Sequence, residues 1–422
     1  MSSADNSSST FAHDILIIGA GLSGLSCAHY LTKENCNVKV LEAEDKPGGR
    51  VQTDLVEGYQ LDRGFQVLLT AYPETRELLN YPPLQLRKFQ PGALVRSGGN
   101  WHRLVDPWRQ PQHFFSTLFS SIGSVKDRMV VHNLRNRLIR KSLDSIYEST
   151  ETSTEEYLQK LGFSEGMINQ FFRPFLGGIF LENELQTSSR MFEFVFKMFS
   201  LGDTCVPAKG MQAIAQQLAD RLPENTISYQ QKVQSIEPHT VRLMNGETLT
   251  AKIIIVATSS QAASSLLSNF SDIPLSFPKM KQTACYYFVA EKAPLNEPIL
   301  LLNGEGKGFI NNVNIMSNVA EEYAPEGKTL LSVSVVGSEV PEEQTIQQEL
   351  SKWFGEEANS WRHLKTYVIE SSLPEQQTLK VQTSPKCHHD FLYVCGDYLE
   401  TASINGAIAS GRRLAETILS KK

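Results

Sequence analysis

The sequence predicts an α/β fold: a discontinuous dinucleotide-binding domain of the Rossmann type, with a second, α+β domain of mixed sheet and helices. Three features predict it. A glycine-rich turn follows a short apolar run near the N-terminus, a wholly apolar strand lies mid-chain, and a strand near the C-terminus ends in Gly-Asp. At 422 residues, the chain is also longer than one hydrophobic core usually serves, so we expect two structural units.

The N-terminal segment predicts a compact βαβ unit. The apolar run Ile15 to Ile18 ends in GAGLSG, and apolar residues then recur at helical spacing. A second apolar-rich run, Val38 to Leu41, ends at Glu42. An acid at the end of the second strand accepts hydrogen bonds from ribose hydroxyls and disfavours a 2'-phosphate, which argues against NADP at this site.

The glycine-rich turn predicts contacts with a pyrophosphate. Gly19 permits the tight turn, Gly21 lets the backbone approach the anion, and Gly24 lets helix and strand pack closely. The helix N-terminus would present free N–H groups to the phosphates. The residues expected to hold the nucleotide here are Gly19, Ala20, Gly21, Leu22, Ser23 and Gly24.

Two further segments follow the acid: Pro47-Gly48-Gly49-Arg50 and Leu61-Asp62-Arg63-Gly64-Phe65-Gln66. In this order the motifs resemble the flavoprotein superfamily of amine oxidases, protoporphyrinogen oxidases and phytoene desaturases. The resemblance implies FAD as cofactor and a domain of the glutathione-reductase type. It places Ala43, Gly48, Gly49 and Arg50 along the ribose and diphosphate, and Gly64, Phe65 and Gln66 near the isoalloxazine.

The chemistry of Arg50 also suits a phosphate independently of the resemblance. A second phosphate needs a cation, and a guanidinium offers a planar, bidentate one. The alternative is a solvated loop arginine.

The C-terminal region matches the second flavin signature of the superfamily. Leu392 to Asp397 reads as a strand, followed by SINGAIASG and a helix ending near Ile418. The resemblance implies that Asp397 holds the ribitol or reaches the phosphate through a bridging group. Gly396, Asn405, Gly406 and Ala407 complete this part of the expected site, where the positive end of the helix would lie near the flavin.

Residues 226–258 predict a small sheet with a hairpin turn at Asn245-Gly246. Leu249 to Lys252 is expected to be one strand, and Ile253 to Thr258 a separate central parallel strand. By resemblance, Val233 would meet the adenine end of FAD. We therefore assign 13–84, 206–275 and 386–422 to the FAD-binding domain, 85–205 and 276–385 to the substrate domain, and 1–12 to a disordered tail.

Phenylalanines are dense from Phe171 through Phe199, where they either fill a core or line an apolar pocket. The pocket interpretation predicts a hydrophobic small-molecule substrate, isoprenoid- or carotenoid-like, that is desaturated by hydride transfer to the flavin. The electron acceptor would be oxygen or a quinone.

Amine oxidases of this superfamily commonly place a lysine near the flavin, and the matching strand here reads QTACYYF from Gln282 to Phe288, without a lysine; Lys279 and Lys281 precede it. This departure favours a desaturase or dehydrogenase over a flavin amine oxidase. A non-redox FAD-dependent isomerase and a flavin-binding scaffold are further alternatives. The candidates for the reacting face are Lys209, Tyr286, Tyr287 and Arg173.

Charge and composition exclude several partners. A net charge of -6 with pI near 5.9 provides no basic field for nucleic acid. Six scattered cysteines without a CxxC pair indicate a reducing, cytoplasmic setting and no metal site; His388-His389 beside Cys387 reads as a loop. The basic amphipathic stretch Lys126 to Lys141 is compatible with peripheral contact with an anionic membrane or with a solvated face.

Overall fold

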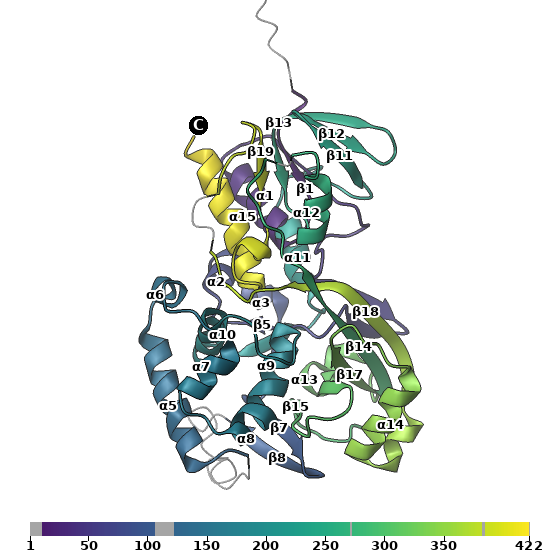
Figure 1. Cartoon of the computed structure of the whole chain (residues 1–422). Coiled ribbons are helices and arrows are strands. Elements are labelled where there is room, and N and C mark those ends of the chain that lie inside the picture. The colour runs from purple at the N-terminus through teal and green to yellow at the C-terminus, as the bar shows by residue number, and fades with distance from the viewer. Residues whose placement is uncertain (1–10, 106–121, 271, 382–384, 422) are drawn as a thin grey trace, which may run out of the picture.

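The computed structural model describes residues 11–105, 122–270, 272–381 and 385–421. Residues 1–10 of the predicted tail (1–12) therefore lie outside the described residues. Two sheets organise the chain, one in the upper part of Figure 1 with the first and last described segments and one in the lower part beside a helical lobe.

The first sheet has seven strands in the order β10-β2-β1-β13-β12-β11, with β19 paired to β13. The strands are β1 (His13–Ile18), β2 (Val38–Leu41), β10 (Ile227–Ser228), β11 (Val233–Glu237), β12 (Thr240–Leu243), β13 (Thr248–Val256) and β19 (Leu392–Val394). β10, β2, β1, β13 and β19 run parallel. The sheet thus joins three segments that are far apart in the sequence.

β13 corrects the prediction of two separate strands after the hairpin turn. Its first half pairs antiparallel with β12, where Val241 faces Leu249 across the turn at Gly246. Its second half pairs parallel with β1 on one side and β19 on the other. Only this second half is buried on both faces, which explains why the sequence pattern changes within one continuous strand.

Helices α1 (Leu22–Lys33) and α15 (Ile404–Leu419) lie side by side on this sheet (Figure 1). A Cβ on Gly411 would lie 2.2 Å from the carbonyl oxygen of Ser23, so only glycine allows this approach. The hydroxyl of Ser26 donates a hydrogen bond to the carbonyl of Ile408 (2.9 Å). The first and last helices are therefore packed together. Two shorter helices, α11 (Gln212–Ala219) and α12 (Ser260–Leu266), belong to the same part of the chain.

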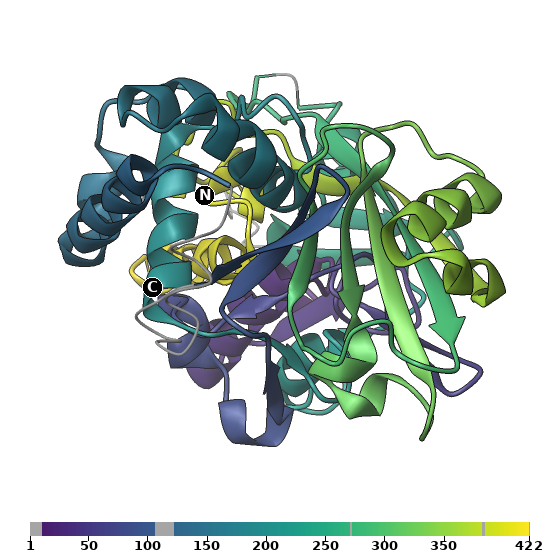
Figure 2. The same ribbon diagram turned by 90° about the horizontal axis from the view of Figure 1, so that it is seen from below.

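The second sheet also has seven strands, in the order β18-β14-β17-β16-β15-β7-β8. They are β7 (Gly92–Ser97), β8 (Asn100–Val105), β14 (Met280–Ala290), β15 (Leu300–Asn303), β16 (Ile310–Ile315), β17 (Thr329–Val336) and β18 (Arg362–Pro374). Helix α14 (Glu343–Phe354) covers its outer face with Ile346 and Leu350, as the view from below shows (Figure 2). The inner face turns toward the helical lobe.

The helical lobe contains α5 (Val125–Arg140), α6 (Leu143–Tyr147), α7 (Thr154–Lys160), α8 (Glu165–Met167), a π-helical turn η2 (Ile168–Phe172), α9 (Arg173–Phe180) and α10 (Ser189–Leu201). Ser153 caps the start of α7, because its hydroxyl accepts a hydrogen bond from the N–H of Glu156 (3.2 Å). The Ser124 hydroxyl caps α5 in the same way with Asp127.

Short elements connect the two sheets. They are β3 (Thr53–Val56), β4 (Tyr59–Asp62), β5 (Leu68–Leu69), α2 (Pro73–Leu78), α3 (Tyr81–Leu84), β6 (Leu86–Lys88) and β9 (Thr204–Pro207), whereas α13 (Met316–Val319) joins β16 to β17 within the second sheet. The segments assigned from sequence to the FAD-binding domain supply every strand of the first sheet, and those assigned to the substrate domain supply every strand of the second.

Candidate functional site

A cavity of about 2010 Å³ is lined by residues of both sheets and of the helical lobe. Ligand pockets commonly measure about 300–1,000 Å³. This cavity is therefore large enough for a cofactor together with a second molecule.

The glycine-rich turn forms one end of the cavity. Gly19 adopts a φ of 106°, and a Cβ added at Gly21 would meet nothing within 4 Å, so the backbone at Gly21 is open to the cavity. A Cβ on Gly24 would lie 2.0 Å from the carbonyl oxygen of Gly19, which explains the need for glycine there. Of the six predicted residues, Gly19, Gly21, Leu22 and Ser23 line the cavity, whereas Ala20 and Gly24 do not.

Glu42 is a buried carboxylate that both holds this turn and lines the cavity. Its Oε2 accepts from the N–H of Ala20 (2.7 Å) and its Oε1 from the N–H of Glu44 (3.0 Å). A carboxylate has about four acceptor positions, so others remain for hydroxyl groups of a ligand. Ala43 and Val233, which were also predicted to contact the cofactor, line the cavity too.

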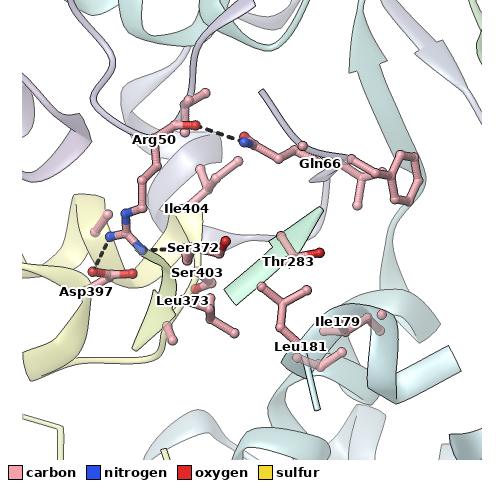
Figure 3. A pocket seen from close by; sticks show the side chains of 18 of the residues that line it. Arg50, Gln66, Ile179, Leu181, Thr283, Ser372, Leu373, Asp397, Ser403 and Ile404 are labelled. Carbon is pink, nitrogen blue, oxygen red and sulfur yellow. Dashed lines mark hydrogen bonds and ion pairs between the residues drawn. The ribbon is translucent and has the colours of Figure 1, made fainter. Parts of the chain in front are cut away.

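Arg50 and Asp397 form an ion pair inside the cavity wall (Figure 3). Arg50 Nη2 donates to Asp397 Oδ1 (2.6 Å), and Nη1 donates to the carbonyl of Ser372 (3.0 Å). Burial lowers the pKa of the Arg50 guanidinium, but the charge of Asp397 outweighs this and leaves it raised. The sequence assigned Arg50 to the diphosphate and Asp397 to the ribitol or, through a bridging group, the phosphate, and the structure adds that the two side chains bind each other.

Gly48, Gly49, Gly64, Phe65 and Gln66 continue the lining from the two motifs that follow Glu42. The Gln66 amide donates to the carbonyl of Arg50 (2.9 Å), so the two motifs are fixed to each other (Figure 3). Gly64 has a φ of 94°, which favours glycine.

The start of α15 closes the same region. Ser403 caps the helix, since its hydroxyl accepts from the N–H of Gly406 (3.0 Å). Gly396 and Ala407 line the cavity, but Gly406 and Asn405 do not. A Cβ on Gly406 would lie 1.9 Å from the carbonyl oxygen of Thr401, and the Asn405 side chain accepts from the N–H of Glu74 (3.0 Å). These two predicted residues therefore shape the helix start.

The residues present fit a flavin dinucleotide. The open backbone at Gly21 and the N-terminus of α1 suit phosphates, Glu42 suits a ribose, and Arg50 adds a cation to the wall between them. The N-terminal end of α15 adds the positive end of a second helix dipole to the lining, through Ser403 and Ile404.

Beyond this site the cavity continues into an apolar arm. Five phenylalanines of the dense segment line the cavity: Phe171, Phe172, Phe175, Phe196 and Phe199. Phe171 and Phe175 stack with ring centroids 5.4 Å apart. Phe180, Phe192 and Phe194 are fully buried and lie outside the lining, so the segment fills a core and lines a cavity at the same time.

Residues 22–419 match the family of flavin containing amine oxidoreductases. The chain belongs to this family. The amine oxidoreductase family consists of flavin-containing proteins, and FAD is the cofactor of this chain.

Individual relatives of this family member are distant. Protoporphyrinogen oxidase 2 of Arabidopsis thaliana is 28% identical over 39% of this chain and 32% of its own length. An L-amino acid oxidase of Bothrops pictus is 27% identical over 59% of this chain and 53% of its own length. The matches thus span about a third to a half of these relatives. An oxidoreductase structure from Methanosarcina mazei, 19% identical, covers 96% of this chain and 100% of its own with a TM-score of 0.72, which shows a shared fold.

The four residues predicted near the reacting face all lie outside the cavity lining: Lys209, Tyr286, Tyr287 and Arg173. Tyr286 points to the outer face of the sheet, where its hydroxyl donates to the carbonyl of Pro341, because side chains alternate along β14. Tyr287 is buried and donates to the carbonyl of Asp62 (2.8 Å). Arg173 pairs with Glu155 (2.6 Å), and Lys209 is exposed.

Lys281 lies outside the cavity lining as well. A bulge between Lys281 and Thr283 shifts the register of β14 against β18. Lys281 Nζ donates to the carbonyl of Phe180 (3.0 Å) and to the hydroxyl of Thr187 (3.1 Å), and burial lowers its pKa. Thr283 is the residue through which β14 lines the cavity.

Sequence reasoning missed several lining residues near the two flavin motifs. These are Gln231, Lys232, Ser372, Leu373, Ser403 and Ile404. Ser372 contributes a backbone carbonyl, which every residue type has, so its sequence carries no signal for this contact. In the described ranges, no helix is both long and apolar enough to cross a bilayer, and no three metal-binding side chains cluster.

Proposed function

We propose that this chain is an FAD-dependent oxidoreductase that dehydrogenates a large hydrophobic molecule of isoprenoid or carotenoid character. The carrying observation is the single cavity that runs from the open backbone at Gly21 to the stacked Phe171 and Phe175. The arm supplies the apolar contact area that a hydrocarbon chain needs, at roughly 25 cal/mol for each Å² buried.

FAD, when bound, accepts a hydride from a substrate C–H bond. The residues of the chain then have three tasks. The phenylalanines of the arm orient the substrate and exclude water. The Arg50–Asp397 pair holds the N-terminal and C-terminal motifs in one wall. The N–H groups at the start of α15, behind Ser403, favour negative charge in the adjoining part of the cavity.

Thr283 supports desaturation of a carbon skeleton over oxidation of an amine. It stands on the strand where an amine oxidase would offer a lysine, and its hydroxyl is bonded to the carbonyl of Val335 (2.8 Å). Of the activities named for the relatives, oxidation of a tetrapyrrole such as protoporphyrinogen fits a phenylalanine-lined arm better than oxidation of an amino acid. The zwitterion of an amino acid needs charged partners when it is buried.

The direct experiment is an anaerobic screen for bleaching of the bound flavin. Isoprenoids, carotenoid precursors, tetrapyrroles and amines are mixed with the FAD-loaded protein, and the product mass is measured. We expect bleaching by an apolar compound and a product lighter by the mass of two hydrogens. An unchanged mass would indicate isomerisation, and bound flavin that no compound bleaches would indicate a scaffold. Readmitting oxygen or a quinone then identifies the electron acceptor that restores the colour.

We further propose that the substrate enters from an anionic membrane surface beside α5. Val125 and Met129 of this helix are 60% and 57% exposed and also line the cavity. The helix carries five lysines and arginines and one acid, Asp127, which is buried. Basic amphipathic helices of this kind bind anionic headgroups. Sedimentation with phosphatidylglycerol vesicles at low salt tests the proposal, since a Val125→Asp/Met129→Asp variant should bind less than the wild type, and a wild type that stays in solution contradicts it.

A further inference from the structure

The face of the second sheet that points toward the cavity carries a group of polar side chains, although it is buried. Its polar residues on β14, β17 and β16 are Thr283, Cys285, Ser332, Ser334, Asn312 and Asn314, beside Tyr287 and Val336 on the same face. The opposite face of the same strands is an apolar core against α14. A sheet covered on both faces normally carries apolar residues on both, and a buried polar group costs free energy unless it is hydrogen-bonded. This face therefore requires polar partners.

Three of these side chains reach the cavity: Thr283, Ser334 and Asn312. Asn312 lies directly opposite Ser334 on the neighbouring strand, and Thr283 lies diagonally across from Ser334, opposite Val336. Directly opposed side chains have Cβ atoms about 5 Å apart. In Figure 3, Thr283 lies in the wall between Gln66 and Leu181. The three residues thus form one polar patch that begins near the flavin motifs.

The patch retains hydrogen-bonding capacity toward the cavity. The amide of Asn312 donates to Asn311 Oδ1 (2.8 Å) and accepts from Asn314 Nδ2 (3.0 Å), which leaves one N–H and one lone pair of the amide. The hydroxyl of Ser334 has no hydrogen-bond partner among the described residues. Ser334 and Asn312 can therefore donate to, and accept from, the same group of a ligand.

The patch is uncharged, and so are its neighbours in the lining, Gly178, Leu302 and Val336. A buried ammonium or carboxylate needs an opposite charge, which this patch does not supply. We propose that the substrate carries an uncharged oxygen function, a hydroxyl or a carbonyl, on its apolar skeleton, and that Ser334 and Asn312 bind it. The inference rests on the proposed function, since the rest of the substrate is assigned to the phenylalanine arm.

The test compares two isoprenoids that share a fifteen-carbon skeleton, the alcohol farnesol and the hydrocarbon farnesene. Equilibrium dialysis against the FAD-loaded protein gives both dissociation constants. We expect the wild type to bind farnesol about tenfold more tightly, because one or two additional hydrogen bonds form. Ser334→Ala and Asn312→Leu should each remove most of this preference. Ser332→Ala is the matched control, since Ser332 lies on the same face two residues away but outside the lining.

A second readout reports the hydrogen bond itself. The infrared carbonyl band of bound farnesal should lie at lower frequency than in hexane, and should return toward the hexane value in the Ser334→Ala/Asn312→Leu variant. Equal affinity of the wild type for farnesol and farnesene would overturn this inference and leave the proposed function standing. Failure of both compounds to bind would overturn the hydrophobic-substrate proposal together with this inference. The wild-type comparison decides the matter even if a variant does not fold.

Discussion

Arg50 Nη2 lies 2.6 Å from Asp397 Oδ1 and thereby joins two motifs that are 347 residues apart in the sequence. Arg50 follows β2, and Asp397 follows β19, the last strand along the chain; both strands belong to the first sheet. The ion pair is part of the cavity wall, so the cofactor site depends on correct pairing of the two ends of the chain.

Breaking this pair should weaken FAD binding and stability together. Asp397→Asn leaves the Arg50 guanidinium without its partner charge, and because the Arg50 side chain is 33% exposed we expect a cost of about 1–2 kcal/mol, less than for a fully buried pair. We expect at least about a tenfold loss of FAD affinity in titration of the apoprotein, and a lower midpoint in urea. The double variant Arg50→Gln/Asp397→Asn should be less impaired than the sum of the single variants. Strict additivity would mean that the two side chains act separately.

The stability of the fold should fall with rising pH because of Asp62. Burial raises the pKa of this carboxyl to about 6, although hydrogen bonds from Thr53 and Met211 oppose the shift. The folded chain therefore holds the proton more tightly than the unfolded chain. The stabilisation is complete below about pH 4 and is lost as the pH rises through about 6, a change of roughly 3 kcal/mol. Glu400, whose pKa burial raises to about 7, contributes a slope of the same sign, so urea unfolding across this range should show a steeper slope in the wild type than in Asp62→Asn.

Asp54 provides an internal control of opposite sign. Burial opposes its ionisation, but hydrogen bonds from Arg63 and Lys46 outweigh burial and hold the pKa of Asp54 below its ordinary value. Its stabilisation is therefore present at neutral pH and is lost on acidification through that lowered pKa. In Asp54→Asn, the free energy of unfolding should therefore fall less on acidification than it does in the wild type. A common pH slope in both variants would contradict the assignment of either group.

Truncation of Phe175 should damage substrate binding and leave the cofactor in place. Its ring lines the apolar arm, stacked on Phe171 and 5.4 Å from the ring of Phe199. Loss of such contacts is worth about 1–3 kcal/mol, so Phe175→Ala should raise the KM for an apolar substrate about 10- to 100-fold. The FAD content should equal that of the wild type. Phe194→Leu, a buried position outside the lining, should lower the melting temperature with little change in KM.

Lys197 should prove to be structural despite its buried charge. Its ammonium group donates to the carbonyls of Leu138, Ile139 and Lys141 at 2.8–2.9 Å, which caps the C-terminal end of α5. Lys197→Met keeps the length of the side chain but leaves these carbonyls unpaired, so we expect a loss of about 2 kcal/mol in the free energy of unfolding. Circular dichroism during thermal unfolding measures it. Unchanged stability would show that water satisfies the carbonyls equally well.

The local parts of this structure were predictable from the sequence. The turn at Gly19, the acid at Glu42 and the hairpin at Gly246 each depend on residues that are neighbours in the chain, so residue type and periodicity suffice. The capped helix start at Ser153 belongs to the same class, because the cap joins residues three positions apart.

The residues at the reacting face could not be predicted, because their orientation depends on contacts between strands that are far apart in the sequence. Whether Lys281 or Thr283 faces the cavity depends on a bulge in the pairing of β14 with β18, and a shift of one residue moves every side chain to the other face. Tyr286 and Tyr287 were assigned without this register and point elsewhere. The position of the Ser372 carbonyl in the cavity wall could not be predicted either, because every residue type has a backbone carbonyl.

The visible absorption spectrum of the purified chain, before and after incubation with FAD, tests the central claim most directly. We predict a yellow protein that holds equimolar FAD. Gly21→Val should fold but remain colourless, because the added side chain has open space in the fold yet projects into the cavity at the phosphate end. A folded wild type that takes up no FAD, or a Gly21→Val variant that binds FAD as tightly as the wild type, would contradict the account.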